Sequence, residues 1–209
     1  MIAPGGEQNE ERYVFDTRPL INTILAANGY ILDVACSGLV VTTASVQSEF
    51  AASAAVVCSK SLVQASLGDR YAAQIANACT SWTEYFGNHA AIQVVSLTDV
   101  EVRISLQLER QESHSLSIDP GEADVLAVCA QRGWIAVLDD APARGAALAL
   151  GIPTLGSVEL LIRAVRRGAI SHSDGEEALD RMRSAYWFRA PRYSLSDVLS
   201  GKAPIWPGG

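Results

Sequence analysis

Asp139 and Asp140 are the residues whose type and spacing most directly suggest chemistry in this sequence. They follow the apolar run 134–138 and precede a helical pattern that begins at Ala141. Such a run is typical of a buried parallel strand, and open α/β sheets bind ligands at the carboxyl ends of these strands. Because adjacent carboxylates repel each other, the pair requires a cation, a proton or a basic neighbour. Arg144 either contacts a phosphate or pairs with one of the two aspartates, and we expect the ion pair.

Three further acids lie near the ends of expected strands or within expected helices. Asp16 follows the apolar run 13–15, Glu122 lies three residues after Asp119, and Glu49 lies within a helical pattern. Each acid has a plain structural alternative. Asp16 fits a helix N-cap, Asp119 with Glu122 fits a capping box, and Glu49 fits an exposed helix position. Capping alone explains the acids one at a time, but it does not explain their combination.

The combination predicts a metal site at one edge of a sheet. In a doubly wound sheet, the carboxyl ends of the strands and the starts of the following helices converge. Carboxylates that converge repel each other unless a hard divalent cation with oxygen ligands, such as Mg²⁺ or Mn²⁺, lies among them. Such a cation activates water and stabilises charge on a phosphoryl group. The predicted reaction class is therefore metal-dependent hydrolysis of phosphodiesters.

Strands and helices alternate along the chain, which predicts an α/β fold with a mainly parallel sheet. The first helix has Pro19 near its start and is stopped by Asn28-Gly29, and its buried stripe is Leu20, Ile21, Ile24 and Leu25. Residues 98–112 are expected to form an amphipathic helix with Val102, Leu106 and Leu108 as its apolar positions. We expect strands at 13–15, within 30–41, and at 91–97, 134–138 and 152–155, and further helices within 30–41, from 45, at 119–132, 141–150, 157–167 and 174–187.

Three stretches stand apart from this alternation. Residues 1–11 are expected to be a disordered or irregular extension, and 52–90 an alanine-rich helical middle. The tail 189–209 contains three prolines and a final Gly-Gly pair, so we expect it to be irregular. The folded domain would therefore span 12–188.

Composition indicates a globular protein. Of the 209 residues 49% are apolar and 19% are charged, which suits a chain with a full core. No stretch approaches the roughly 18 uncharged apolar residues of a membrane helix, and the polar, acidic start does not resemble a signal peptide. The cysteines are widely spaced without a CxxC motif, so we expect buried, reduced thiols in a cytoplasmic protein. Both a P-loop and a GxGxxG motif are missing, which disfavours nucleotide binding.

Charge is unevenly distributed along the sequence. The net charge of −7 argues against a general electrostatic grip on nucleic acid. Many arginines nevertheless gather in the last third of the chain, and this predicts a basic flank beside an acidic centre, unless they form an ordinary solvated helix face. These arginines are Arg163, Arg166, Arg167, Arg181, Arg183, Arg189 and Arg192.

The acidic elements together resemble those of PIN-domain nucleases, in particular the VapC-toxin-like branch. The opening strand with its Asp-Thr, the helix with a glutamate, the Asp-Pro-Gly-Glu-Ala helix start and the Leu-Asp-Asp-Ala-Pro-Ala-Arg segment each resemble one acidic element of the family. The likeness covers roughly residues 12–188 and is most specific at 119–170. The segments that carry it are 13–17 with 20–21, 44–50, 119–130, 138–147 and 150–170.

The resemblance implies an acidic metal site with one carboxylate from each element. The fourth element of the family often reads Thr-x-Asp. This chain has Leu138-Asp139-Asp140 instead, which leaves open which aspartate faces the metal. By position in the family, the metal ligands would be Asp16, Glu122 and Asp140, and Glu49 would be the fourth catalytic acid. Asp139 would be a further neighbour of the metal. The secondary residues would be Thr17, Asp124 and Arg144, and Thr17 would orient water or a ligand.

The resemblance also implies a three-layer α/β/α fold and a Mg²⁺- or Mn²⁺-dependent nuclease, with RNA favoured over DNA. Many members of the family form homodimers, and many are toxins neutralised by a small antitoxin. The alternative is a catalytically inactive PIN-like module that binds nucleic acid or protein. Retention of all four acids favours the enzyme.

Two other enzyme or signalling classes fit the sequence less well. A haloacid-dehalogenase phosphatase needs a second aspartate two residues after the first, where this chain has Arg18. A phosphate-receiver domain needs an acidic pair early in the chain and a late lysine, whereas the acidic pair here is late and the lysines are Lys60 and Lys202.

Overall fold

Short runs of β-branched and aromatic residues form a parallel sheet at the centre of the protein. The computed structural model describes residues 11–27, 30–36, 38–52, 92–110, 118–184 and 194–203. Its sheet has the strand order β3-β2-β1-β4-β5, and all of its pairings are parallel. Because β1 is central, the side chains of Tyr13, Val14 and Phe15 are fully buried. The strands are β1 (Arg12–Phe15), β2 (Leu39–Thr43), β3 (Gln93–Val95), β4 (Ile135–Val137) and β5 (Thr154–Leu155).

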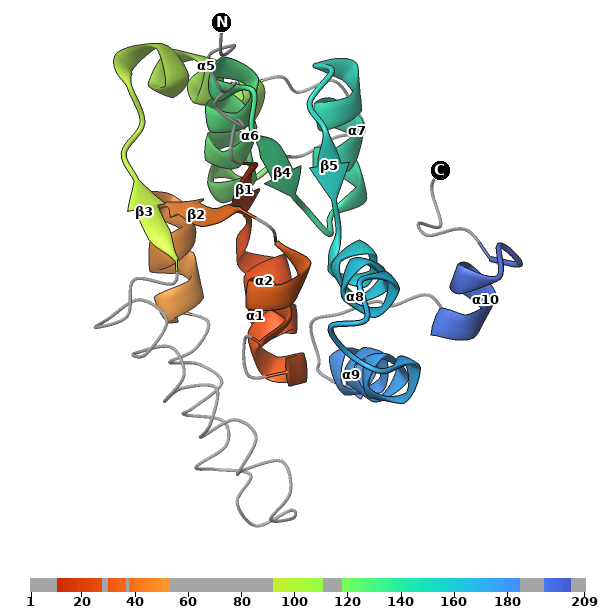
Figure 1. The fold of residues 1–209 in the computed structure, drawn as a ribbon. Coiled ribbons are helices and arrows are strands. Elements are labelled where there is room, and N and C mark those ends of the chain that lie inside the picture. The colour runs from red at the N-terminus through yellow and green to blue at the C-terminus, as the bar shows by residue number, and fades with distance from the viewer. Residues whose placement is uncertain are drawn as a thin grey trace, which may run out of the picture.

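Helices cover both faces of this sheet (Figure 1). On one side α6 packs against β1, β2 and β4, with α5 and α7 beside it, and on the other side α1, α2, α8 and α9 pack together. The short helix α10 contacts α9. This arrangement confirms the predicted three-layer α/β/α fold. The helices are α1 (Thr17–Ala27), α2 (Tyr30–Ala35), α5 (Asp99–Arg110), α6 (Pro120–Arg132), α7 (Ala141–Ala149), α8 (Ser157–Arg166), α9 (His172–Ser184) and α10 (Leu195–Leu199), and residues 44–52 are also helical.

The direction in which the chain fills the sheet changes between β1 and β4. From β1 the chain adds β2 and β3 on one side, and it then returns to add β4 and β5 on the other. Val14 lies opposite Val41 on β2 and opposite Ala136 on β4. Such a switch point leaves a crevice outside the carboxyl ends of the strands, which is where open α/β sheets bind ligands. Asp16 follows β1, and the pair Asp139-Asp140 follows β4 after Leu138, so these acids flank the switch point.

Helix α5 presents a different face to the core from the one that its apolar residues predict. Val102 and Leu106 are 42% and 41% exposed, while the side chains of Glu101, Ser105 and Leu108 are buried against the molecule. The sequence-based expectation for Val102 and Leu106 was therefore wrong. Polar partners on α6 turn the helix, because Glu101 and Ser105 form hydrogen bonds with residues of that neighbour.

The C-terminal tail was expected to be irregular, but it contains a short helix. Helix α10 lies within it, and its N-cap residue Ser194 forms a capping box with Asp197. Leu195 and Val198 are buried, so the helix docks through an apolar stripe. The Gly-Gly end, residues 1–10 and almost all of the alanine-rich middle lie outside the described residues.

The composition led to expectations about the cysteines and about membrane-spanning helices. Cys36 and Cys129 are buried, as expected, whereas Cys58 and Cys79 lie outside the described residues. In the described part of the chain, no helix is both long and apolar enough to cross a membrane.

Candidate metal centre

Asp16 lies at the carboxyl end of β1, where the chain turns into α1. Its side chain is 3% exposed, and its carboxylate accepts the backbone N–H groups of Thr17 and Arg18. These bonds are those of a helix N-cap. Burial outweighs them, and with the negative charge of Asp119 it raises the pKa of Asp16 from 3.8 to about 7. A buried carboxyl that titrates near neutral pH is ready to exchange its proton for a cation.

Glu49 comes to the same place from the helical segment 44–52. The Thr17 hydroxyl donates to its Oε2 at 2.8 Å, and the Gly121 N–H donates to the same carboxylate. Burial raises the pKa of Glu49, and the charge of Asp119 adds to this effect. A Cβ on Gly121 would lie 2.8 Å from Glu49 Oε2, so a larger residue at this position would force the carboxylate to shift. Thr17 therefore orients a site acid directly.

Asp119 and Glu122 enter the site together at the start of α6. They form the predicted capping box, in which Asp119 Oδ1 accepts the Glu122 N–H at 2.9 Å and Glu122 Oε2 accepts the Asp119 N–H at 3.2 Å. Glu122 is 3% exposed. Its burial raises its pKa to about 8, and the charges of Asp119, Asp16 and Asp140 contribute. The capping role and the site role therefore coexist in the same two residues.

Three of these carboxylates meet closely enough to share an ion. One oxygen each from Asp16, Glu49 and Asp119 lies within 4.8 Å of the others. An all-oxygen, all-carboxylate donor set suits a hard divalent cation such as Mg²⁺ or Mn²⁺. The raised pKa values of Asp16 and Glu122 fit the same conclusion, because burial and the charges of the neighbouring carboxylates both disfavour the ionised form, and a bound cation would offset this.

Asp140 completes the cluster from the end of β4. It occupies the N-cap position of α7, yet its side chain makes no capping hydrogen bond. Its Oδ2 accepts a hydrogen bond from Arg18 Nη1 at 3.1 Å. The charge of Asp140 also contributes to the raised pKa of Glu122, so its carboxylate lies near that acid.

Asp139 turns away from the cluster and ties three elements together. Its Oδ1 accepts the backbone N–H of Ser157 at 2.8 Å, and its Oδ2 accepts both Asn22 Nδ2 at 2.8 Å and the Ser157 hydroxyl. Gly156, the N-cap residue of α8, has no side chain with which to cap, so Asp139 caps that helix from another strand. Burial raises the pKa of Asp139, while these hydrogen bonds oppose the increase. The structure thus gives Asp139 a bracing role between β4, α1 and α8.

Arg144 pairs with Glu159, a partner that the sequence did not suggest. Its guanidinium bonds Glu159 through Nη1 at 2.8 Å and through Nη2 at 3.1 Å. Its charge also opposes the rise in the pKa of Asp139 that burial causes. Glu159 lies on α8, fifteen residues further along, and in the sequence it resembles any exposed helix glutamate.

Asp124 lies on α6, two residues after Glu122. Its Oδ2 accepts the Ser45 hydroxyl at 2.6 Å, and its Oδ1 accepts the Ser105 hydroxyl at 2.7 Å. It therefore connects α5 and the helical segment of Glu49 to α6. Asp124 fixes the helices that carry the site acids, and its charge also raises the pKa of Glu49.

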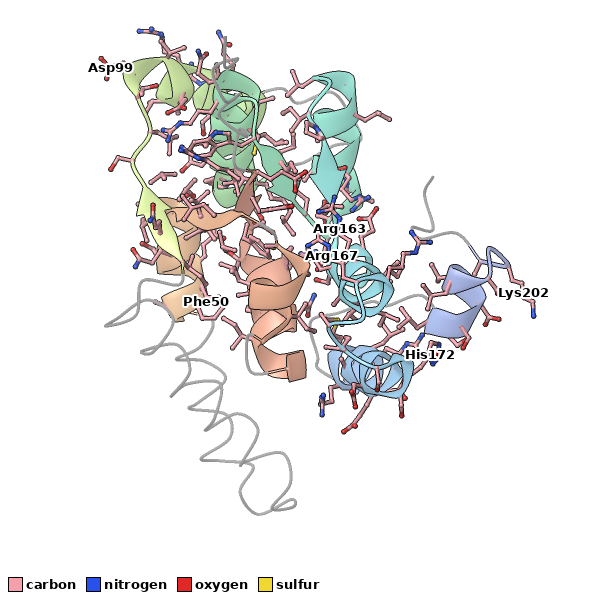
Figure 2. All side chains as sticks on the ribbon, in the orientation of Figure 1. Phe50, Asp99, Arg163, Arg167, His172 and Lys202 are labelled. Carbon is pink, nitrogen blue, oxygen red and sulfur yellow. The ribbon has the colours of Figure 1, made fainter. Side chains whose placement is uncertain are left out.

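Part of the predicted basic flank is used to hold the fold together. Arg163 lies on α8 and Arg167 is the C-cap residue of that helix (Figure 2). Arg163 Nη1 donates to the Tyr13 hydroxyl at 3.0 Å, and Arg167 Nη1 donates to the Ala35 carbonyl at 2.9 Å. The aromatic run 186–188 lies outside the described residues.

Sequence reasoning missed two residues of the site. Asp119 was assigned only to capping, because a cap explained it completely. Arg18 was noticed only as the residue that excluded a phosphatase. The sequence held no direct signal for either residue, since the partners of Arg18 and Asp119 come from segments far away along the chain.

Comparison with known proteins agrees with this geometry. A family model described as a PIN domain matches residues 74–201, more than half of the chain. No match is found among curated proteins, and none among solved structures. The matched segment contains Asp119, Glu122 and Asp140, whereas Asp16 and Glu49 precede it. The fold is what joins the two groups of acids.

Proposed function

The chain belongs to the PIN-domain family, and from this premise we propose that it is a metal-dependent nuclease that hydrolyses phosphodiester bonds. The observation that carries the proposal is the convergence of carboxylates from three separate segments at the switch point of the sheet, with Asp140 of a fourth segment near Glu122. Burial and mutual repulsion make this cluster unfavourable for a metal-free fold, as the raised pKa values of Asp16 and Glu122 indicate. An arrangement that opposes stability is typical of a functional site.

Mg²⁺ or Mn²⁺ would be held by Asp16, Glu49 and Asp119, with Glu122 and Asp140 completing the acidic shell. When bound, such a cation lowers the pKa of water to produce a nucleophile and stabilises the negative charge of a phosphoryl group. The assignment of Asp119 as a ligand extends the set inferred from the sequence, and Asp139 is reassigned to bracing.

The residues around the acids prepare them for this role. The Thr17 hydroxyl and the Gly121 N–H hold the carboxylate of Glu49 in one orientation. Asp16 and Glu122, whose pKa values are about 7 and about 8, keep protons near neutral pH and release them when a cation takes their place. Cation binding should therefore be tighter at higher pH.

We further propose single-stranded RNA as the substrate and a homodimer as the working form in the cytoplasm. A role as a toxin neutralised by a small antitoxin is also proposed. The support for these points is the likeness to the VapC-toxin-like branch described from the sequence. A small gene beside this one would support the antitoxin partner. Light scattering of the purified protein tests the dimer.

The central test is cleavage of labelled single-stranded RNA and DNA with Mn²⁺, using wild type, Asp16→Asn and Asp119→Asn. Each variant keeps the size of the side chain and removes one carboxylate charge. We expect each to lose at least about a hundredfold in rate, since even outer-shell changes reduce metal-site activity by about 10- to 100-fold. Asp180→Asn, an exposed aspartate of α9 paired with Arg183, is the matched control and should cleave like wild type.

Metal binding measured by calorimetry separates the remaining outcomes. Cleavage that survives both substitutions would place the active site elsewhere. Binding of nucleic acid without cleavage and without Mn²⁺ affinity would favour the inactive binding module.

A further inference from the structure

Arg18 lies at the solvent side of the acidic cluster. It is the second residue of α1, directly after the buried residues Asp16 and Thr17. Its side chain is 53% exposed, whereas that of its partner Asp140 is 23% exposed. The two residues are 122 positions apart in the sequence, and their contact spans the switch point between β1 and β4.

The fold gains little from an arginine at this position. A positive charge in the first turn of a helix opposes the helix dipole, which favours anions there. An exposed ion pair such as that of Arg18 with Asp140 typically contributes between 0 and about 1 kcal/mol. Neither helix formation nor this surface contact explains why a cation is placed beside the site.

The chemistry of Arg18 suits a phosphate. A guanidinium carries five N–H donors in a planar fork that matches phosphate oxygens, and Arg18 uses one N–H group in its hydrogen bond with Asp140. Within the described residues this is its one side-chain hydrogen bond. A nucleic-acid strand that approaches several carboxylates meets repulsion, which a positive charge at the entrance would reduce.

We propose that Arg18 binds a backbone phosphate of the nucleic-acid strand that lies over the acidic cluster. In the free protein its guanidinium rests on Asp140, and in the complex it contacts a phosphate beside that carboxylate. Arg18 is thus a substrate-binding residue that the family likeness did not assign. The inference rests on the proposed nuclease function.

The test measures binding separately from cleavage. In the Asp16→Asn background, where cleavage is expected to be blocked, the affinity for a fluorescently labelled single-stranded RNA is measured by anisotropy with Mn²⁺ at several salt concentrations. Arg18→Gln should weaken binding about fivefold near 0.1 M salt, as expected for an exposed ion pair. The slope of log affinity against log salt should decrease in magnitude by about 0.7, the value for one phosphate contact with a single strand.

Two further variants sharpen the result. Arg18→Lys keeps the charge and should restore the salt slope, with only part of the affinity, because lysine lacks the fork. Arg103→Gln is the matched control. Arg103 is an exposed arginine of α5, two residues after Glu101. Glu101 accepts a hydrogen bond from Arg132, which lies at the C-terminal end of α6. That end lies about 15 Å along the helix from Glu122, at about 1.5 Å per residue. This control should change neither affinity nor slope.

The outcomes separate this inference from the proposed function. If wild type cleaves RNA in a way that depends on Asp16, but Arg18→Gln binds with the same affinity and slope as Arg103→Gln, the role of Arg18 is wrong and the nuclease stands. The same holds if Arg18→Gln changes only the affinity for Mn²⁺. If wild type neither binds nor cleaves nucleic acid, both proposals fail.

Discussion

Replacing Asp16 by asparagine is expected to stabilise the metal-free protein, and to do so more strongly as the pH rises. Burial is the main cause that raises the pKa of Asp16 from 3.8 to about 7. Between these values the folded chain keeps a proton that the unfolded chain has lost, so the free energy of unfolding falls as the pH rises through this window. Asparagine has no proton to lose, so the variant is free of this penalty.

The change in the free energy of unfolding follows from the pH range between the unfolded and folded pKa values of Asp16. Each pH unit over which the folded and unfolded chains differ by one proton changes the free energy of unfolding by about 1.4 kcal/mol. From pH 5 to pH 7 this amounts to about 3 kcal/mol, and the change levels off above the folded pKa of Asp16. Glu122, with a pKa of about 8, acts in the same direction in both proteins and therefore largely cancels in the comparison.

The assay is urea unfolding followed by tryptophan fluorescence at pH 5, 6, 7 and 8 with a chelator present. The difference in free energy of unfolding between Asp16→Asn and wild type should grow by about 3 kcal/mol across this range. The control Asp180→Asn, at an exposed position on α9, should differ from wild type by an amount that does not change with pH. Adding Mn²⁺ should stabilise wild type more than Asp16→Asn. A difference for Asp16→Asn that stays constant with pH would show that this carboxyl is ionised in the metal-free fold, contrary to the reasoning.

Two further substitutions test the surroundings of the site. Gly121→Ala places a methyl group 2.8 Å from Glu49 Oε2, so Mn²⁺ affinity and the cleavage rate should each drop about tenfold. The free energy of unfolding should stay the same or rise by up to about 1 kcal/mol, because alanine has the higher helix propensity. The same change at Gly145, where a Cβ meets nothing within 4 Å, should leave cleavage unaltered, and equal effects at both positions would refute the steric argument. Glu101→Gln breaks the hydrogen bonds of the buried Glu101 carboxylate with Arg132. In urea unfolding, the free energy of unfolding should fall by about 3 kcal/mol. A loss below about 1 kcal/mol would show that water already screens this pair.

The sequence was sufficient for the elements that local signals define. The alternation of apolar runs with helical patterns predicted the parallel α/β fold, and the Asp-Pro-Gly-Glu segment predicted the start and capping box of α6. The positive φ of Gly133, which ends that helix, was likewise predictable from the glycine alone. Tail helix α10 was missed because prolines around it suggested irregular chain, although Ser194 and Asp197 carry a capping signal.

What the sequence determined by itself was the family, the fold class and four candidate acids, Asp16, Glu49, Glu122 and Asp140, because strand and helix patterns, caps and motif spacing all depend on neighbours within a few residues. The tertiary structure decided which acids act together. Asp139 and Asp140 are adjacent in the sequence, yet Asn22 and Ser157 hold one of them against α8 while Arg18 meets the other at the site. These partners lie 117, 18 and 122 residues away, so no local pattern could distinguish the two carboxylates. The same reason explains why Asp119 joined the cluster, because only the packed fold brings it beside Asp16 and Glu49.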